Sequence, residues 1–292
     1  MLVAAAPAAH PQQPPYSGSE ACGTCHEDIF KAFAKNPHHS VETSKKKGFE
    51  GQACESCHGP GAKHAESGSA EDIRNPAKLT AAQADRACMA CHMNEPTHAG
   101  RIQSSHAKNL VACTSCHQIH ANGPFGLVAR KPADINRQCA ACHQNVWAQF
   151  TRPFKHRLPE NAMSCVDCHN PHGSFRPGML QTASANEPGC FRCHGDKRGP
   201  FAFEHAPVRF DGCWSCHEPH GSANPRMLVR HEVRFVCLEC HANLPATAAG
   251  GTRAALGVVP PAFHDLRSPR FQNCAICHQK VHGSHVDRNL LR

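Results

Sequence analysis

The sequence lacks any long hydrophobic run. No stretch of its 292 residues approaches the roughly 18 apolar residues that mark a transmembrane helix, so none is expected. No alternation of apolar and polar residues is long enough to predict a β-sheet. Aromatic residues make up only 6% and charged residues 18%, whereas 21 Gly and 23 Pro interrupt the chain. The apolar core is therefore expected to be thin for a chain of this length.

Cysteine, by contrast, is abundant, and all twenty cysteines belong to Cys-x-x-Cys-His pentapeptides. The cysteine pairs are Cys22/Cys25, Cys54/Cys57, Cys88/Cys91, Cys113/Cys116, Cys139/Cys142, Cys165/Cys168, Cys190/Cys193, Cys213/Cys216, Cys237/Cys240 and Cys274/Cys277. The histidines that complete them are His26, His58, His92, His117, His143, His169, His194, His217, His241 and His278. This pattern is the attachment signature of c-type haem. Two thiols at this spacing reach the two vinyl groups of one porphyrin, and the next residue binds the iron. The sequence therefore predicts ten covalently bound haems.

Other uses of paired cysteines explain the pattern less well. Zinc ribbons also use thiolate and imidazole ligands, but they do not require His directly after the second Cys. A disulfide framework leaves the histidines unexplained. A thioredoxin-like redox pair needs a single motif beside a βαβ pattern, and no such pattern is visible.

Ten haems also account for the composition and the charge. Each haem is a large, mostly apolar body that can replace a side-chain core, so we expect the chain to be largely unfolded without haem. The formal net charge of +8 would suggest anionic partners. Because each haem brings two propionates, ten haems add roughly 20 negative charges and reverse that balance. Binding to nucleic acid is not expected, and the Lys and Arg residues are interpreted as propionate partners and a solvated surface.

Enough histidines remain to give every iron a second histidine ligand. From residue 38 onward a free His precedes one motif, another free His follows it, and a second motif comes next, with a period near 50 residues. These haem-pair repeats are residues 38–92, 106–143, 156–194, 205–241 and 264–282. Each supplies two candidate distal ligands: His38, His64, His106, His120, His156, His172, His205, His220, His264 and His282.

Two of these assignments have alternatives, because His98 could replace His106 and His39 could replace His38. The histidines left over are assigned to the surface or to propionates: His10, His39, His98, His231 and His285. Methionine is the competing axial ligand, but none of the six Met recurs in register with the repeats. Two histidines on each iron leave no coordination site open for substrate. An electron carrier is therefore predicted rather than an enzyme.

The predicted fold class is irregular and mostly α-helical, with short helices and loops organised around a chain of ten haems. Thr80 and Gln83 form a capping box that predicts a helix over residues 80–92. Similar helices are expected over residues 20–34, opening after Ser19, and 135–150, opening after Asp134.

The first 18 residues differ from the rest. Their Ala-rich start is similar to the end of a secretory signal, and the Pro-rich stretch after it predicts a flexible lead-in. Residues 19–292 then form one decahaem domain. Haem is attached on the periplasmic side in bacteria, so export is implied.

Several segments carry a family resemblance: SEACGTCH, ACESCHGPGAKH, HRLPENAMSCVDCHNPHGS, FEHAPVRFDGCWSCHEPHGS and CHQKVHGS. From about residue 17 to its end, the chain resembles the decahaem cytochromes of the MtrA and DmsE type. The resemblance implies bis-histidine haems and a location in the periplasm, embedded in an outer-membrane porin complex. The implied partners are a β-barrel porin, periplasmic electron-donor cytochromes, and an extracellular multihaem cytochrome or reductase.

A row of ten porphyrins would outreach the roughly 30 Å of hydrocarbon in a bilayer. A polar, loop-rich chain cannot face lipid, so such a conduit would need the barrel around it. A soluble periplasmic shuttle, a multihaem reductase and a subunit of a cytochrome filament are the alternatives. A reductase is disfavoured because no Cys-x-x-Cys-Lys is present and the only tyrosine, Tyr16, precedes the first haem motif.

Overall fold

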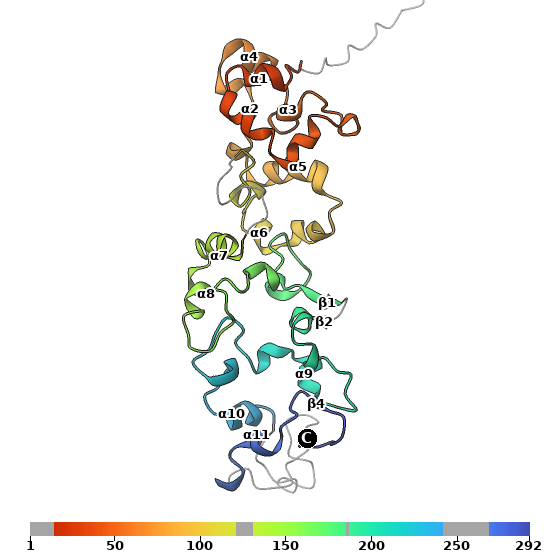
Figure 1. Cartoon of the computed structure of the whole chain (residues 1–292), viewed down its shortest axis with the longest axis vertical. Coiled ribbons are helices and arrows are strands. Elements are labelled where there is room, and N and C mark those ends of the chain that lie inside the picture. The colour runs from red at the N-terminus through yellow and green to blue at the C-terminus, as the bar shows by residue number, and fades with distance from the viewer. Residues whose placement is uncertain (1–14, 121–130, 185–186, 242–268) are drawn as a thin grey trace, which may run out of the picture. The chain divides into compact units, whose positions relative to one another are not determined.

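The structure is a computed structural model that describes residues 15–120, 131–184, 187–241 and 269–292 (Figure 1). The contacts divide the chain into two units. Unit 1 comprises Met1–Arg130 and Pro171–Phe175, and unit 2 comprises Lys131–Asn170 and Arg176–Arg292. Most of the predicted lead-in, with His10, and the candidate ligand His264 lie outside the described residues. Among the residues described, no helix is long and apolar enough to span a membrane.

Unit 1 consists of short helices joined by irregular chain. They are α1 (Ser19–Gly23), α2 (Glu27–Phe33), α3 (Ala53–His58), α4 (Ala62–Ser67), α5 (Ala81–His92) and α6 (Ser105–Lys108). Helix α1 packs against both α2 and α3. A buried carboxylate holds this cluster together, because Glu55 of α3 accepts hydrogen bonds from the backbone amides of Ser17, Gly18 and Gly61 at 2.7–2.9 Å.

Among its described residues, unit 2 adds four very short strands to the same kind of helical chain. Its helices are α7 (Pro132–Ala140), α8 (Gln144–Gln149), α9 (Ala206–Phe210), α10 (Val233–Leu238) and α11 (Cys274–Cys277). Strand β1 (Thr182–Ser184) pairs antiparallel with β2 (Glu187–Pro188), and β3 (Phe203–Glu204) pairs antiparallel with β4 (Gly283–Ser284). The mostly helical, irregular class predicted from the sequence is confirmed for the described residues.

The predicted helix at residues 80–92 is confirmed, but the two other helix predictions were wrong in extent. Helix α5 follows Thr80, whose backbone amide donates to Gln83 Oε1 at 3.0 Å. Residues 20–34 form two helices, and Ser19 begins α1 instead of capping it. The hydroxyl of Ser19 donates instead to Glu42 at 2.7 Å. Residues 135–150 are likewise split between α7 and α8, because the turn that carries the haem motif ends one helix before the next begins.

Every motif is wound into one helical turn. The amide of the motif histidine donates to the carbonyl of the first cysteine in motif after motif, as between His26 and Cys22 at 3.0 Å and between His143 and Cys139 at 2.9 Å. Residues at positions i, i+3 and i+4 share one face of such a turn. Both thiols and the imidazole of each motif are therefore presented on the same side.

Side chains supply a small core. The buried apolar residues among those described are Ala53, Ala84, Ala112, Phe150, Leu158 and Phe191. The buried polar residues are more numerous: Ser19, Glu55, Arg101, Ser104, Asn136, Ser164, Ser222 and Ser284. This confirms the thin core expected from composition, and it leaves the half-buried faces of the motif turns for another apolar body to cover.

Candidate haem-binding sites

The two cysteines of a motif differ in their surroundings, although the sequence does not distinguish them. The first cysteine is half-buried in nine motifs and exposed only at Cys190. The second cysteine is half-buried at Cys116 and Cys216, and it is exposed in the other motifs, at Cys25, Cys57, Cys91, Cys142, Cys168, Cys193, Cys240 and Cys277. No disulfide joins the cysteines that the structure describes. The second thiols are therefore accessible to a porphyrin, and their covalent attachment to haem stays a prediction.

Three pairs of neighbouring motifs are joined by a polar side chain placed three residues before the first cysteine of the earlier motif. Ser19 Oγ accepts from the amide of Cys54 at 3.3 Å. Asp85 Oδ1 and Asn136 Oδ1 accept in the same way from the amides of Cys113 and Cys165, each at 3.0 Å. One side chain on the helix of the first motif thus fixes the start of the next motif's turn.

The side chains of consecutive motifs also touch. First cysteines contact one another in five pairs: Cys22 with Cys54, Cys88 with Cys113, Cys139 with Cys165, Cys190 with Cys213, and Cys237 with Cys274. Between these pairs, Cys57 lies within electrostatic range of Cys88 and Cys91, Cys168 of Cys190 and Cys193, and Cys216 of Cys240. Within unit 1 the first four motifs therefore follow one another in space in sequence order, and within unit 2 the last six do.

Eight motif histidines each face one of the histidines expected as second ligands. The pairs and the distances between ring centres are His26–His64 6.2 Å, His58–His120 5.7 Å, His92–His38 5.9 Å, His117–His172 5.9 Å, His169–His220 6.0 Å, His194–His156 6.2 Å, His217–His282 6.3 Å and His241–His205 6.2 Å. In each pair one ring belongs to a motif and the other comes from elsewhere in the chain.

This spacing fits a haem iron. Metal–imidazole nitrogen bonds are about 2 Å long, and each ring centre lies ~1 Å behind its nitrogen, so two rings on one iron have centres roughly 6 Å apart. Rings in direct stacking contact would be closer than this. The paired rings therefore leave room between them for one metal ion, with a motif's two thiols nearby.

The second ring nitrogen is held by the backbone. Among motif histidines, His58 Nδ1–H donates to the Arg74 carbonyl at 2.9 Å and His169 Nδ1–H to the Gly178 carbonyl at 2.7 Å. Among the facing histidines, His64 Nδ1–H donates to the Ser69 carbonyl at 2.8 Å. Such a bond fixes the tautomer and the ring orientation and leaves Nε2 as the lone-pair donor to a metal.

His92 has two histidine neighbours. Besides His38, His98 lies with its ring centre 6.1 Å from that of His92, and it stacks on His172 at 4.2 Å. The shorter distance leaves no room for an iron between His98 and His172. The other proposed substitute, His39, packs edge-on against Phe33 at 6.0 Å.

Burial keeps several of the facing histidines neutral. Desolvation, assisted by neighbouring positive charge, lowers the pKa of both His172 and His282 to about 4. Burial also lowers the pKa of His120 and of His220 below the ordinary histidine value. Neutral imidazole is the form that binds a metal, so these rings are in the required state at neutral pH.

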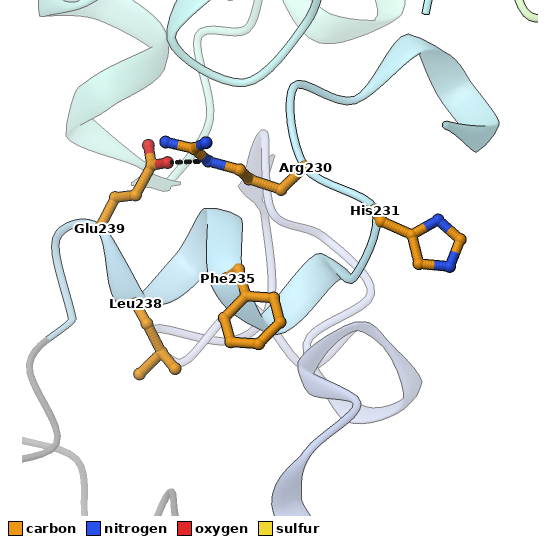
Figure 2. A pocket seen from close by; sticks show the side chains of 5 residues that line it. All are labelled: Arg230, His231, Phe235, Leu238 and Glu239. Carbon is orange, nitrogen blue, oxygen red and sulfur yellow. Dashed lines mark hydrogen bonds and ion pairs between the residues drawn. The ribbon is translucent and has the colours of Figure 1, made fainter. Parts of the chain in front are cut away.

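An open pocket of about 460 Å³ lies on α10, beside the ninth motif. Figure 2 shows Phe235 and Leu238 projecting from the helix below an ion pair in which Arg230 Nε donates to Glu239 at 2.7 Å. His231 is exposed and points away from these side chains. Apolar side chains beneath a paired cation suit a flat apolar ring that has acidic substituents at its edge.

Two connections were not predicted from the sequence. One is the polar residue three positions before the first cysteine, which differs in each copy (Ser19, Asp85 and Asn136) and so shows no motif by itself. The other is the set of backbone carbonyls that accept from histidine Nδ1, because any residue type can supply a carbonyl. For the first connection, the fixed offset from the motif is the signal that would have revealed it.

Taken together, the motif turns and the paired histidine rings define a multihaem c-type cytochrome. Family models agree: a doubled CXXCH motif matches residues 158–199 and 205–246, and a cytochrome c-type protein NrfB-like family matches residues 54–132. The multihaem cytochrome MtrA of Shewanella baltica is 36% identical over 285 residues, covering 94% of this chain and 81% of the relative. The chain belongs to the MtrA family of multihaem cytochromes, which bind haem iron and carry electrons.

A second relative matches a smaller part of the chain. The C-type polyheme cytochrome OmcC of Geobacter sulfurreducens is 28% identical over 193 residues, which is 59% of this chain and 22% of that protein. Both relatives are named as multihaem cytochromes. The electron-carrier class predicted from the sequence is thus supported by both relatives.

Proposed function

We propose that the chain binds ten c-type haems, one at each Cys-x-x-Cys-His motif, with the motif histidine as proximal ligand. The distal ligands proposed are His38, His64, His106, His120, His156, His172, His205, His220, His264 and His282, as the sequence predicted. Eight of the ten have the ring-to-ring spacing that one iron needs. His38 is preferred to His98 on the iron of His92, because His98 instead stacks on the ligand proposed for the next site.

The protein residues have three tasks in this proposal. The thiols fix each haem covalently, the paired imidazoles fill both axial positions, and the backbone carbonyls orient those imidazoles. When bound, each haem supplies one-electron redox chemistry. With no axial position open to a substrate, transfer to the next haem is the outcome that the arrangement favours, and an enzymatic role is not proposed.

We further propose that the chain is an electron conduit across the outer membrane, held inside a β-barrel porin. Its proposed location is the periplasm, embedded in that outer-membrane porin complex. The observation that supports this is the order of the sites, since consecutive motifs adjoin one another within each unit. Electron transfer weakens steeply with distance, so neighbouring sites in sequence order form a path. Periplasmic donor cytochromes and an extracellular multihaem cytochrome or reductase are the proposed partners at its ends.

Partner recovery tests the conduit. The native protein is extracted from the outer-membrane fraction with mild detergent, and the proteins that co-elute with it are identified. We expect a barrel-sized porin in equal amount. The complex is then placed in liposomes that contain an oxidised viologen dye, and dithionite is added outside.

Reduction of the enclosed dye by the complex, but not by the cytochrome added alone to the same liposomes, is the expected result. Recovery of the cytochrome as a lone periplasmic protein would contradict the conduit and favour the soluble shuttle. Polymers seen by microscopy would favour a filament subunit, and a high-spin haem in the native protein would favour a reductase.

A further inference from the structure

Three copies of a His-Gly-Ser triplet follow haem motifs, at residues 172–174, 220–222 and 282–284. The histidine of each is a proposed distal ligand, and the glycine is buried. The glycines have φ angles of +113° at Gly173, +141° at Gly221 and +144° at Gly283. We call each triplet, together with the residue before it, a clasp.

Each clasp also holds a second histidine from a distant part of the chain. The carbonyl just before the clasp histidine accepts from that ring: Pro171 from His106 Nδ1–H at 3.0 Å, and Pro219 from His156 Nδ1–H at 2.8 Å. In the third copy the backbone of Val281 hydrogen-bonds His205. The residues joined in the first two copies are 65 and 63 positions apart, so this is tertiary and not local structure.

Close backbone contact explains the glycine. A Cβ at Gly221 would lie 2.4 Å from the carbonyl oxygen of Gln149, and one at Gly173 would lie 2.3 Å from that of Gly100. No side chain fits at either distance, and the positive φ disfavours one independently. Beside Gly221, Ser222 and Phe154 exchange two backbone hydrogen bonds at 2.8 and 3.2 Å, which fixes the clasp to the segment that leads to His156.

In the second and third clasps, the two histidines that are held face different motif histidines. In the second clasp, His220 faces His169 at 6.0 Å and His156 faces His194 at 6.2 Å. His169 and His194 belong to consecutive motifs. The third clasp repeats the arrangement, with His282 facing His217 and His205 facing His241.

We propose that the second and third clasps are each a positioning element shared by two neighbouring haem sites, so that the orientations of two distal imidazoles are coupled. This inference rests on the proposed axial ligation. A movement of the Pro219–Ser222 backbone changes the direction in which His220 points, and it changes the acceptor that orients His156. Second-shell hydrogen bonds of this kind set both the orientation and the basicity of an imidazole ligand.

The first test removes the hydrogen bond while retaining an iron ligand. In His156→Met, the thioether can bind iron but cannot donate to Pro219. Electron paramagnetic resonance (EPR) of the oxidised, haem-loaded protein is expected to show two changed low-spin signals. One is the new His/Met haem and the other is a bis-histidine haem with altered g values.

His64→Met is the matched control, because His64 makes an equivalent 2.8 Å bond to the Ser69 carbonyl, which precedes no distal histidine. It is expected to change one signal only. If His156→Met also changes a single signal, or if both variants change two, the coupling is overturned.

The second test keeps all ligands. Gly221→Ala introduces the clash with Gln149 and is expected to shift the g values of two haems while every haem remains low-spin. Gly195→Ala is the control, since that glycine directly follows His194 and a Cβ there meets nothing within 4 Å. It is expected to shift none, and a shift of one haem or none in Gly221→Ala would overturn the proposal. The spectrum of the parent protein separates the clasp proposal from the axial ligation on which it rests. If the parent itself shows no bis-histidine signals, the proposed axial ligation is wrong.

Discussion

At the scale of single residues, the chemistry of the sites depends on which histidines are oriented and spaced to bind a metal ion. A ring that donates Nδ1–H to a backbone carbonyl has its Nε2 lone pair available, and a ring about 6 Å from a motif histidine is correctly spaced. His282 has this spacing, at 6.3 Å from His217. Three residues later, His285 is exposed and packs against Phe201 with ring centres 5.2 Å apart. The two residues have the same side chain but different surroundings.

Replacing each of these histidines by methionine should therefore have different effects. In His282→Met one haem gains His/Met ligation, and its reduction potential is expected to rise by on the order of 0.1 V, within the ~0.8 V that axial ligands span. In His285→Met no potential should move. Redox titration followed by visible spectroscopy measures both variants. Equal titration curves for His282→Met and the parent would remove His282 from the ligand set.

At the scale of elements, the short helices form where a motif needs a turn, and they end where the next segment begins. Local capping predicted α5 correctly because Thr80 and Gln83 lie close together in sequence. The splits within residues 20–34 and 135–150 were not predictable in this way, since Ser19 is engaged by Glu42 and Asn136 by residues after α8. Motif spacing thus predicted which cysteines and histidines are candidate haem-binding residues. The hydrogen-bond partners of buried polar groups, by contrast, depend on tertiary structure.

Asn136 is the clearest of these polar links, at 1% exposure. Its Nδ2 donates to the carbonyls of Leu158 and Met163 at 3.1 and 2.9 Å, while its Oδ1 accepts from the Cys165 amide. Asn136→Asp should lose both donors and place a carboxylate against two carbonyl oxygens. We expect the free energy of unfolding to fall by about 2–4 kcal/mol.

Guanidinium denaturation of the haem-loaded protein, followed by circular dichroism, measures this change. Asn145→Asp makes the same substitution at an exposed position of α8 and should change stability by less than ~0.5 kcal/mol. A loss as small in Asn136→Asp as in this control would show that the link between these motifs carries no stability.

At the scale of the whole molecule, two kinds of connection alternate along the sites of unit 2. A contact between first cysteines and the hydrogen bond from the Cys165 amide to Asn136 join the fifth motif to the sixth. Contacts between first cysteines likewise join the seventh motif to the eighth and the ninth to the tenth. Clasps join the sites of the sixth and seventh motifs, and those of the eighth and ninth. The doubled-motif family model matches the clasped pairs. Each of these four sites is therefore connected both to the site before it and to the site after it, but only by small polar contacts.

Such contacts cannot replace a hydrophobic core, so the fold should depend on haem. The buried apolar side chains among the described residues number six, of which three are alanine. Ordering a chain of this length opposes folding by about 1–2 kcal/mol per residue, which so few side chains cannot offset. Produced without an export signal, in a compartment that does not attach haem, the chain is expected to show little helical circular dichroism and no cooperative thermal transition. The exported, haem-loaded chain is the control and should show both. A cooperative transition in the haem-free chain would mean that its polar contacts alone specify the fold, and that haem is not needed as its core.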